Sequence, residues 1–551
     1  MDKLKPKLFS VMKTYSVNQF IKDIIAGIIV AIIALPLSIA LALASGVTPE
    51  QGLYTAIFAG FVISFLGGSR IQISGPTAAF ATIVAGIAAT QGMDGLIIAT
   101  IMAGIILILM GLFKFGNLIK FIPYTITTGF TFGIAVTILI GQLKDFFGLV
   151  FKKSPIETIE KLEEVVHSFD TFNVQAFLIG MLALIVLIIW PKINKIIPPS
   201  IIAIVITAVL VGVCNLKVNT IGDLYTIKSG LPKVALPNVT ITQIKILLPD
   251  AFTIAILAAI ESLLSCVVAD GMIGSKHRSN MELVAQGAGN ICSGLVGGIP
   301  ATGAIARTAA NAKNGGRTPV AGMVHSVVLM LVLIFLMPYA ALIPMPTIAA
   351  ILFVVAYNMS EWRKFVSIVR KSPKSDIAVL IVTFVLTVCF DLVVAIGVGL
   401  ALACLLFMKK MADVTDVQSW TYINDEDEDN DADNLRYKRV PKNTLVFEIN
   451  GPMFFGAADK FMDIVRETSE DVLIIRMRSV PAIDATALKT LEDIYEVCKE
   501  NHITLIFSHV NERPMKSLEK SGLVTLIGEN NFLPNIDDAL NRANEIVHKK
   551  K

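Results

Sequence analysis

Long runs of apolar residues, separated by short polar or Gly- and Pro-containing stretches, dominate residues 24–408. About 20 apolar residues cross a bilayer as a helix. Runs that approach this length lie at 24–44, 50–66, 95–113, 122–143, 174–190, 197–214, 250–270, 281–297, 319–337, 340–357, 376–391 and 393–408. Two shorter runs lie at 76–90 and 302–312. The pattern predicts a polytopic α-helical membrane protein with 14 spans.

The loop charges predict an orientation for these spans. Five lysines precede the first run: Lys3, Lys5, Lys7, Lys13 and Lys22. Short loops near 91–94, 298–301 and 338–340 hold no Lys or Arg, whereas the alternate loops hold basic residues. Basic loops stay in the cytoplasm, and the first run is too long for a signal-peptide core. We therefore expect a multi-pass protein of the cell inner membrane with cytoplasmic N- and C-termini.

Two of the segments carry Gly and Pro interruptions at matching positions. Ser74-Gly75-Pro76 opens the third span and Gly297-Gly298-Ile299-Pro300 opens the tenth. Pro36 lies 40 residues before Pro76, and Glu261 lies 39 residues before Pro300. Gly and Pro are common in membrane helices, which is the simpler interpretation of one such segment. The matched pair favours a seven-plus-seven inverted-repeat transporter with its site between two half-helices near the midplane.

The half-helices predict where an anion would bind. Proline suits the first turn of a helix, so helices that begin after Pro76 and Pro300 would point unpaired N–H groups at the midplane. Two helix N-termini attract an anion through these groups and their partial positive charges. Arg307 lies in the early turns of the second half-helix and adds a full positive charge.

Glu261 lies near the middle of the eighth span, where a carboxylate is costly and by default functional. Ser265 lies one helical turn away on the same face. Two interpretations remain open. Glu261 and Arg307 form a structural ion pair, or Arg307 attracts the anion while Glu261 gains and loses a proton or another cation. Gln286 and Asn290 are expected to satisfy backbone groups at the break.

Composition removes several classes of function. The chain of 551 residues is 54% hydrophobic and only 17% charged, which excludes a soluble enzyme. Its net charge of +3 is too balanced to indicate a nucleic-acid partner. The six cysteines show no metal-ligand or disulfide spacing. We expect no catalytic residues, no metal and no cofactor.

The chain after the last span has a different composition. An acidic run begins at Asp425 and indicates a linker, assigned to residues 412–436 after a transmembrane domain of residues 1–411. Residues 437–551 alternate strand-like and helix-like segments, which predicts a small cytoplasmic α/β domain. The strands are expected at 444–449, 472–477 and 503–507, and the helices at 457–468, 484–500, 513–521 and 536–548.

The motifs in this order resemble the SulP (sulfate permease) family of anion transporters. The stretches that carry the resemblance are Ala34-Leu35-Pro36, Gly52-Leu53-Tyr54, Ile73-Ser74-Gly75-Pro76-Thr77, Ala259-Ile260-Glu261-Ser262-Leu263-Leu264, Gly287-Ala288-Gly289-Asn290 and Ile305-Ala306-Arg307-Thr308-Ala309-Ala310-Asn311. The C-terminal domain resembles the family's sulfate-transporter/anti-sigma-antagonist (STAS) domain. Within the family, Glu261 and its neighbours look most similar to bacterial proton-coupled dicarboxylate transporters.

The resemblance implies a mobile core of spans 1–4 and 8–11, a gate of spans 5–7 and 12–14, elevator-like movement and a homodimer. It also implies the following anion-binding positions: Thr77, Ala78, Ala306, Arg307, Leu37 and Leu41. Glu261 and Ser265 take the positions that the resemblance associates with ion coupling. The family's sodium-coupled bicarbonate transporters look to have Asp and Thr at these two positions, so Glu and Ser argue against sodium coupling and bicarbonate here. Ala485 takes the place of the serine that is phosphorylated in anti-sigma antagonists, so regulation of that kind is not expected.

These observations lead to one main hypothesis and two alternatives. The main hypothesis is a secondary active transporter, a proton-coupled symporter of sulfate or of a small dicarboxylate or inorganic anion. The alternatives are an uncoupled anion exchanger or channel, and a sodium-coupled bicarbonate transporter. The expected partners are a small anion, protons, membrane lipid, a second copy of the chain and a regulatory protein at the STAS domain.

Overall fold

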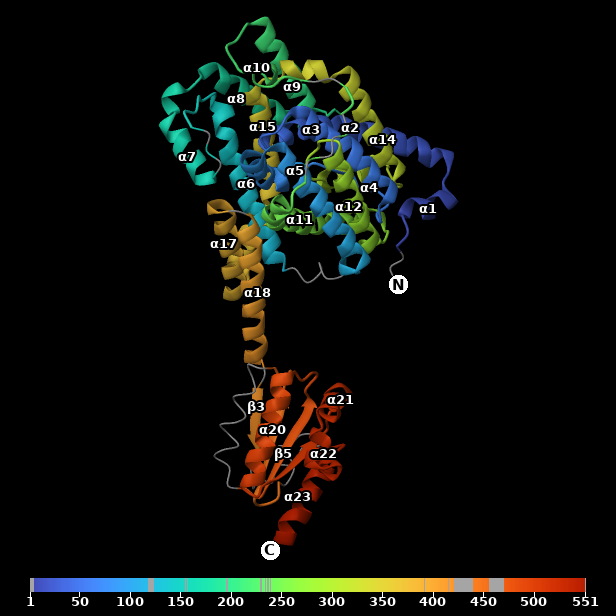
Figure 1. Cartoon of the computed structure of the whole chain (residues 1–551), viewed down its shortest axis with the longest axis vertical. Helices are drawn as coiled ribbons and strands as arrows, with labels where there is room; N and C mark the ends of the chain where they lie inside the picture. Colours follow the sequence, from blue (N-terminus) through green and yellow to red (C-terminus); the bar gives the residue numbers. More distant parts are fainter. Residues whose placement is uncertain are drawn as a thin grey trace. The chain divides into compact units, whose positions relative to one another are not determined.

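The chain divides into two compact units, Met1–Ala401 and Leu402–Lys551 (Figure 1). The computed structural model describes residues 4–116, 123–153, 155, 157–194, 197–227, 230–232, 234, 237, 239–390, 392–414, 416–420, 440–454 and 470–550. The first unit is helical apart from two very short strands, and the second contains a five-stranded sheet.

A helix occupies each predicted span. These helices are α2 (Val17–Ala44), α3 (Pro49–Tyr54), η2 (Thr55–Ala59), α4 (Gly60–Leu66), η3 (Ala78–Phe80), α5 (Ala81–Leu112), α6 (Tyr124–Phe147), α8 (Val174–Ile193), α9 (Pro199–Val213), α11 (Ile241–Ile273), α12 (Ser279–Leu295), α13 (Ile305–Lys313), α14 (Val320–Phe335), α15 (Met345–Ser360), α17 (Lys374–Cys389) and α18 (Leu392–Val414). The shorter elements between them are α1 (Lys7–Val11), η1 (Met12–Thr14), β1 (Ser74–Gly75), α7 (Thr158–His167), η5 (Phe169–Thr171), α10 (Ile221–Leu224), β2 (Thr302–Gly303), η6 (Met337–Leu342) and α16 (Trp362–Lys371).

Two details differ from the simple pattern of separate spans. The segments expected at 76–90 and 95–113 are joined through α5, and a kink at Gly92 (φ 68°) divides them. Glycine adopts this positive φ without strain, which explains the break. Pro36 lies inside α2 without ending that helix.

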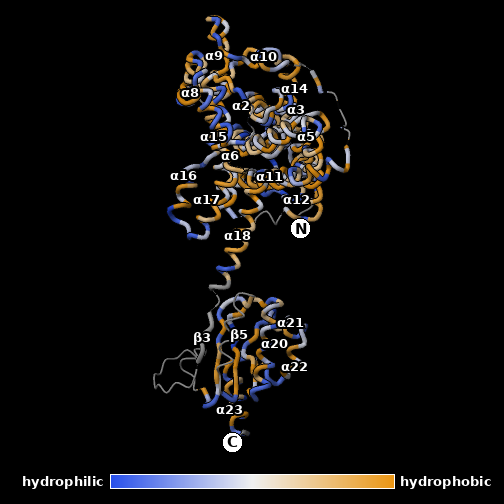
Figure 2. Tube along the Cα trace, turned by 60° about the vertical axis from the view of Figure 1, so that its left-hand side comes forward, coloured by the Kyte–Doolittle hydropathy of each residue, from blue (hydrophilic) through white to orange (hydrophobic). Residues whose placement is uncertain are grey.

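The outer surface of the helical unit suits a lipid environment. Six helices in the described residues are long and apolar enough to cross a membrane, and Figure 2 shows apolar residues along most helices of this unit. On α2, Ile21, Ile25 and Ile28 are exposed at 53%, 49% and 39%, whereas Ala26 and Val30 on the opposite side are fully buried. An apolar stripe exposed at helical spacing faces lipid rather than water.

The helices of this unit pack in two groups. The first group contains α2 to α5 together with α11 to α14, and α5 packs against both α11 and α12 near the middle of the unit (Figure 1). The second contains α6, α8, α9, α15 and α17, with α15 and α17 packed on α6. The first group contains the spans that the family resemblance assigns to the core, and the second contains those that it assigns to the gate, except the last span, α18.

Glycines bring the two central helices of the first group together. A Cβ added at Gly287 of α12 would lie 2.5 Å from the carbonyl oxygen of Gly104 on α5, and one at Gly104 would lie 2.7 Å from that of Gly287. Because both neighbours are backbone atoms, a side chain at this position would force the two helices apart. The crossing of α5 and α12 therefore requires both glycines.

The second unit is an α/β domain with helices on both faces of its sheet. Its strands are β3 (Asp416–Trp420), β4 (Thr444–Asn450), β5 (Val472–Ser479), β6 (Thr504–Ser508) and β7 (Phe532–Leu533). Its helices are α20 (Ala485–Glu500), α21 (Glu512–Ser521), α22 (Leu523–Ile527), η8 (Glu529–Asn531) and α23 (Ile536–Lys550). The strand order is β3-β4-β5-β6-β7, with β3 antiparallel and the others parallel.

Side chains alternate between the two faces of this sheet. On β5, Leu473, Ile475 and Met477 pack into one core with α20, α21 and α22, whereas Val472 and Ile474 pack into a second core with α23. Burial on both faces is typical of a parallel sheet. Strand β3 lies within residues 412–436, where the sequence predicted linker, and the predicted helix at 457–468 lies outside the described residues.

Candidate functional site

The two interrupted segments meet in the first unit. Strands β1 and β2 pair antiparallel, with Ser74 opposite Gly303 and Gly75 opposite Thr302. The Ala304 N–H donates to the Ile73 carbonyl at 2.9 Å and continues the ladder. Helix η3 follows β1 and α13 follows β2, so the helices leave the ladder in opposite directions. Both helix N-termini therefore begin at the same short ladder.

In the described residues, neither helix N-terminus is capped by the side chain of its N-cap residue. Thr77 and Ala304 are the residues before the first turns of η3 and α13, and neither side chain accepts a hydrogen bond from its helix. The first backbone N–H groups of a helix have no intrahelical acceptor. Because no side chain covers them, these groups and the helix dipoles suit a bound anion.

Arg307 lies between the two helix starts. Its side chain comes from α13, is only 3% exposed and donates from Nη2 to the Pro76 carbonyl at 3.2 Å. Its Nη1 is buried without a hydrogen-bond partner in the described residues. A Cβ added at Gly75 would lie 2.8 Å from this Nη1, so the guanidinium packs directly on β1. The charged group of one half therefore contacts the interrupted segment of the other.

Glu261 contacts the same junction from α11. Its Oε2 accepts a hydrogen bond from the Thr77 hydroxyl at 3.0 Å, and its side chain is only partly buried. The described residues show no ion pair between Glu261 and Arg307, so the structural-pair interpretation receives no support from this conformation. The carboxylate lies beside the first residue of one helix start, in contact with the predicted anion site.

The other predicted site residues lie in less direct positions. Ser265 is fully buried and donates to the Thr308 hydroxyl at 3.2 Å, so its partner is α13 rather than Glu261. Ala78 is 6% exposed at the start of η3, and Ala306 is exposed in the first turn of α13. Leu37 and Leu41 lie one turn apart on α2, which packs against α13.

A buried carboxylate that the sequence analysis did not single out binds the backbone of the segment that leads into β1. Glu282 on α12 is fully buried, and Oε2 accepts the backbone N–H groups of Gly68 and Ser69 at 2.8 and 3.1 Å. Its Oε1 accepts from the Gln72 and Gln286 amides at 2.7 and 2.9 Å. Such a network satisfies irregular backbone that is buried away from water.

Asn290 performs the backbone role that the sequence predicted. Its Oδ1 accepts the Ala301 N–H at 2.8 Å and its Nδ2 donates to the Ala301 carbonyl at 2.9 Å, just before β2. Gln286 bonds a side chain instead, because its amide donates to the Ser74 hydroxyl at 3.0 Å. Together the two amides attach one helix, α12, to both interrupted segments.

One further polar residue near Arg307 was missed by the sequence analysis. His325 on α14 is fully buried, and both ring nitrogens are without a hydrogen-bond partner in the described residues. Arg307 is close enough to act on this ring electrostatically. The sequence did contain a signal for this residue, since His325 is a single histidine within an otherwise apolar predicted span.

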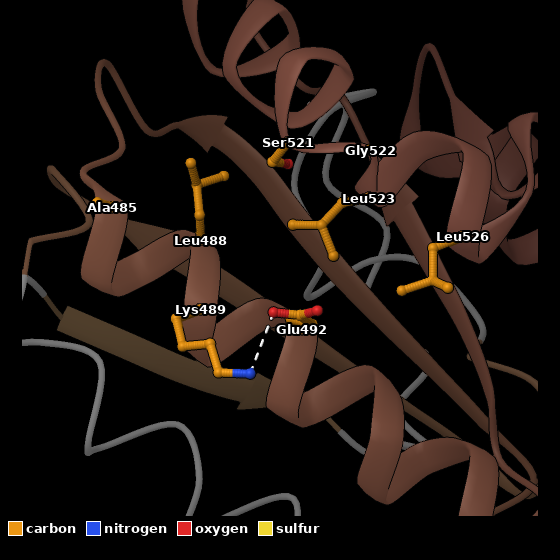
Figure 3. Close-up of a pocket in the computed structure, with 8 residues that line it drawn as sticks. All are labelled: Ala485, Leu488, Lys489, Glu492, Ser521, Gly522, Leu523 and Leu526. Atoms are coloured by element: carbon orange, nitrogen blue, oxygen red, sulfur yellow. Dashed lines mark hydrogen bonds and ion pairs between the residues drawn. The ribbon is translucent and has the colours of Figure 1, made fainter.

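The C-terminal unit has a shallow pocket of its own. It is lined by Ala485, Leu488, Lys489, Glu492, Ser521, Gly522, Leu523 and Leu526 (Figure 3). Asp484 caps α20, since its carboxylate accepts the Ala487 N–H at 2.8 Å. Ala485 opens the helix beside the pocket and offers no hydroxyl for phosphorylation. The described residues of the chain contain no cluster of three His, Cys, Asp or Glu side chains that could hold a metal.

Comparison with known proteins identifies the type of molecule that has this arrangement. Residues 20–383 match the Sulfate permease family and residues 437–539 match the STAS domain. The chain is 40% identical to the Bacillus subtilis protein named "Putative sulfate transporter YvdB" over 96% of its length and 98% of that protein. It is 31% identical to "Bicarbonate transporter BicA" of Picosynechococcus, over 95% of its length and 94% of that protein.

A solved structure has the same fold. The structure titled "The overall structure of SLC26A9" superposes with a TM-score of 0.86 and covers 99% of this chain and 94% of its own, at 19% identity. At that identity the similarity concerns the fold: transmembrane helices followed by an α/β domain.

Proposed function

The chain belongs to the sulfate permease family and carries a STAS domain, and we propose that it is a proton-coupled symporter of sulfate or of a small dicarboxylate or inorganic anion. The family is one of anion transporters, so the protein is a transporter and not an enzyme. The observation that carries the proposal is the buried guanidinium of Arg307, which has one unpaired nitrogen and lies between two uncapped helix starts.

The proposed substrate site consists of Thr77, Ala78, Ala306 and Arg307, with Leu37 and Leu41 of α2 as its wall. Backbone amides and one guanidinium recognise charge and oxygen atoms more strongly than the shape of a molecule. The relatives fit this range, since one is named a sulfate transporter and another a bicarbonate transporter. Sulfate, bicarbonate, succinate and fumarate are therefore the anions to test.

The proposed proton site is Glu261, with Ser265 supporting the adjacent helix. The Thr77 hydroxyl links the Glu261 carboxylate to the first residue of the substrate site at 3.0 Å. An anion beside Arg307 adds negative charge near this carboxylate and favours its protonation. By linkage, protonation of Glu261 then favours anion binding by the same factor. A proton and an anion would therefore cross together, driven by an inward proton gradient.

The second packing group suggests how the site would gain access to both sides. In the proposed elevator mechanism, α2 to α5 and α11 to α14 carry the site as one body past α6, α8, α9, α15 and α17. All the proposed substrate and proton groups belong to the first body. A homodimer in the inner membrane, with both termini in the cytoplasm, completes the proposal.

The test is uptake by full-length protein in proteoliposomes with labelled sulfate, bicarbonate, succinate and fumarate, with and without an inward proton gradient. Coupling predicts that one of these anions accumulates only when the outside is acidic. Accumulation that requires sodium instead, with bicarbonate as the substrate, would support the sodium-coupled alternative. Uptake that only equilibrates under every gradient would support an exchanger or a channel.

The Glu261→Gln variant tests whether Glu261 is the proton-coupling group. Glutamine resembles the protonated carboxyl group, so the variant is expected to retain binding and exchange but to lose acid-driven accumulation. Glu50→Gln, which changes a buried carboxyl group in α3, is the matched control and is expected to accumulate the anion as the unmodified protein does. If Glu261→Gln still accumulates the anion at acidic outside pH, the coupling group lies elsewhere.

A further inference from the structure

Helix α16 (Trp362–Lys371) connects two spanning helices without being a span itself. It follows α15 after a turn at Glu361, where φ is 42°, and Ser372 and Pro373 separate it from α17. Figure 2 shows it at the edge of the helical unit beside α17. Because α16 has only ten residues and joins the ends of two predicted spans, we expect it to lie at the level of the membrane surface.

One face of α16 is attached to the protein. The Phe365 ring stacks on Phe132 of α6 with centroids 4.4 Å apart and meets Phe384 of α17 edge-on at 5.6 Å. Ile368, three residues further, is only 8% exposed. These contacts fix the rotation of α16 about its axis, and therefore determine which residues its other faces present outward.

The second face is apolar and exposed. Trp362, Val366 and Val369 follow the i, i+4, i+7 spacing of one helix face. Trp362 is 42% exposed and Val369 is 37% exposed, while Val366 is partly buried. A tryptophan beside branched apolar residues is typical of the boundary between acyl chains and headgroups.

The third face is cationic. Arg363, Ser367 and Arg370 share the same i, i+4, i+7 spacing and are all exposed, and Lys371 and Lys374 continue the basic surface. Glu361 pairs with Lys364 at 2.6 Å, so in the described residues its charge is already compensated. The Arg363 guanidinium lies over the Trp362 ring at 5.5 Å, which directs it along the line between the apolar and the cationic faces.

We propose that α16 binds the headgroup of an anionic phospholipid of the surrounding bilayer. Trp362, Val366 and Val369 lie against its acyl chains, and Arg363 and Arg370 bind its phosphate, with the Ser367 hydroxyl between them. Arginine suits phosphate because two parallel N–H groups donate to two oxygens. The positive charge of this face also complements a negatively charged leaflet surface.

The test is native mass spectrometry of the full-length protein, released from bilayers that contain equal amounts of phosphatidylglycerol and phosphatidylcholine. We expect phosphatidylglycerol to stay bound to the unmodified protein, and the triple variant Arg363→Gln, Arg370→Gln, Lys374→Gln to retain about tenfold less. The matched control Lys152→Gln, Lys153→Gln, Lys217→Gln removes three exposed charges from other loops and should retain phosphatidylglycerol normally.

A second variant distinguishes the loss of positive charge from a loss of folded structure. Arg363→Lys with Arg370→Lys keeps both charges, and it should retain most of the phosphatidylglycerol if headgroup charge is recognised. Three results would overturn the proposal: equal retention by the triple glutamine variant, an equal loss in the control, or equal retention of phosphatidylcholine by the unmodified protein. An unchanged melting temperature of the triple variant shows that its loss of lipid comes from the missing cations.

Discussion

Arg307 has hydrogen-bond donors that the described residues do not pair, which leaves the candidate site able to bind an acceptor. A guanidinium has five N–H donors, and a buried donor left without a partner costs about 1–3 kcal/mol. In the described residues only the Pro76 carbonyl at 3.2 Å accepts from Arg307, while Nη1 has no acceptor. An anion bound beside β1 would supply the missing acceptor and the missing negative charge together.

The Arg307→Ala variant should therefore lose anion binding while the protein still folds. Removing one partner of a buried charge pair costs about 2–5 kcal/mol, at least ~30-fold in Kd. Lysine at this position should restore binding only in part, because it lacks the planar arrangement of donors. The measurement is isothermal calorimetry or thermal-shift titration, with Lys313→Ala, an exposed cation on the same helix, as the control. Unmodified affinity in Arg307→Ala would contradict the assignment.

Glu164, in the loop helix α7, predicts a pH dependence of stability. The Lys152 backbone N–H at 2.9 Å, with further donors from Lys153 and Ser168, holds the pKa of the Glu164 carboxyl below its ordinary value of 4.5. A carboxyl whose pKa is lowered by folding stabilises the protein above the unfolded-state pKa and loses this contribution as the pH falls through the folded value. Glu164→Gln should thus melt earlier at pH 7, and the difference from the unmodified protein should shrink as the pH is lowered below 4.5 toward 3.

Thermal unfolding in detergent across this pH range measures the effect. Glu163→Gln changes the neighbouring, exposed carboxyl group of the same helix and should leave the melting temperature unchanged at both pH values. A Glu164→Gln melting temperature equal to that of the unmodified protein at pH 7 would show that these hydrogen bonds contribute nothing to stability.

At the scale of elements, the sequence predicted what local composition determines. Apolar runs of bilayer length placed a helix in every predicted span, and the Gly-Pro breaks located both half-helices. Contacts between distant segments were not predictable in this way, because no local pattern pairs Glu282 with the backbone of Gly68 and Ser69 across more than 200 residues. Strand β3 was missed for a related reason. Its five residues form a strand by pairing with β4, and they lie just before an acidic run.

The glycine contact between α5 and α12 gives a prediction at the same scale. Gly287→Val should destabilise the helical unit, because its Cβ would overlap the Gly104 carbonyl and overpacking costs about 1–3 kcal/mol. Gly141→Val on α6 is the matched control, since nothing lies within 4 Å of its added Cβ. Scanning fluorimetry should show a melting temperature several degrees lower for Gly287→Val only. Equal melting of both variants would mean that the two helices move apart easily.

At the scale of the whole molecule, the two units have separate cores and separate chemistry. All the proposed site residues precede Asn311, whereas both cores of the C-terminal unit are formed by residues after 439. Deletion of residues 436–551 should therefore leave substrate binding intact but reduce transport or assembly. Calorimetric binding and proteoliposome uptake on the same purified sample separate these effects. A monodisperse truncated protein that binds no substrate would contradict this prediction.

The ladder between β1 and β2 also has a consequence for the synthesis of the protein. The Ile73 carbonyl receives its hydrogen bond from Ala304, and the Ile73 N–H donates to Thr308. When the ribosome has translated the first four spans, these partners do not yet exist. The segment before η3 must then wait in or beside the insertion machinery with its peptide groups unpaired, which lipid does not tolerate. Maturation of the first repeat therefore depends on synthesis of the second, and a chain that stalls before residue 302 should be recognised by quality-control proteases as unfinished.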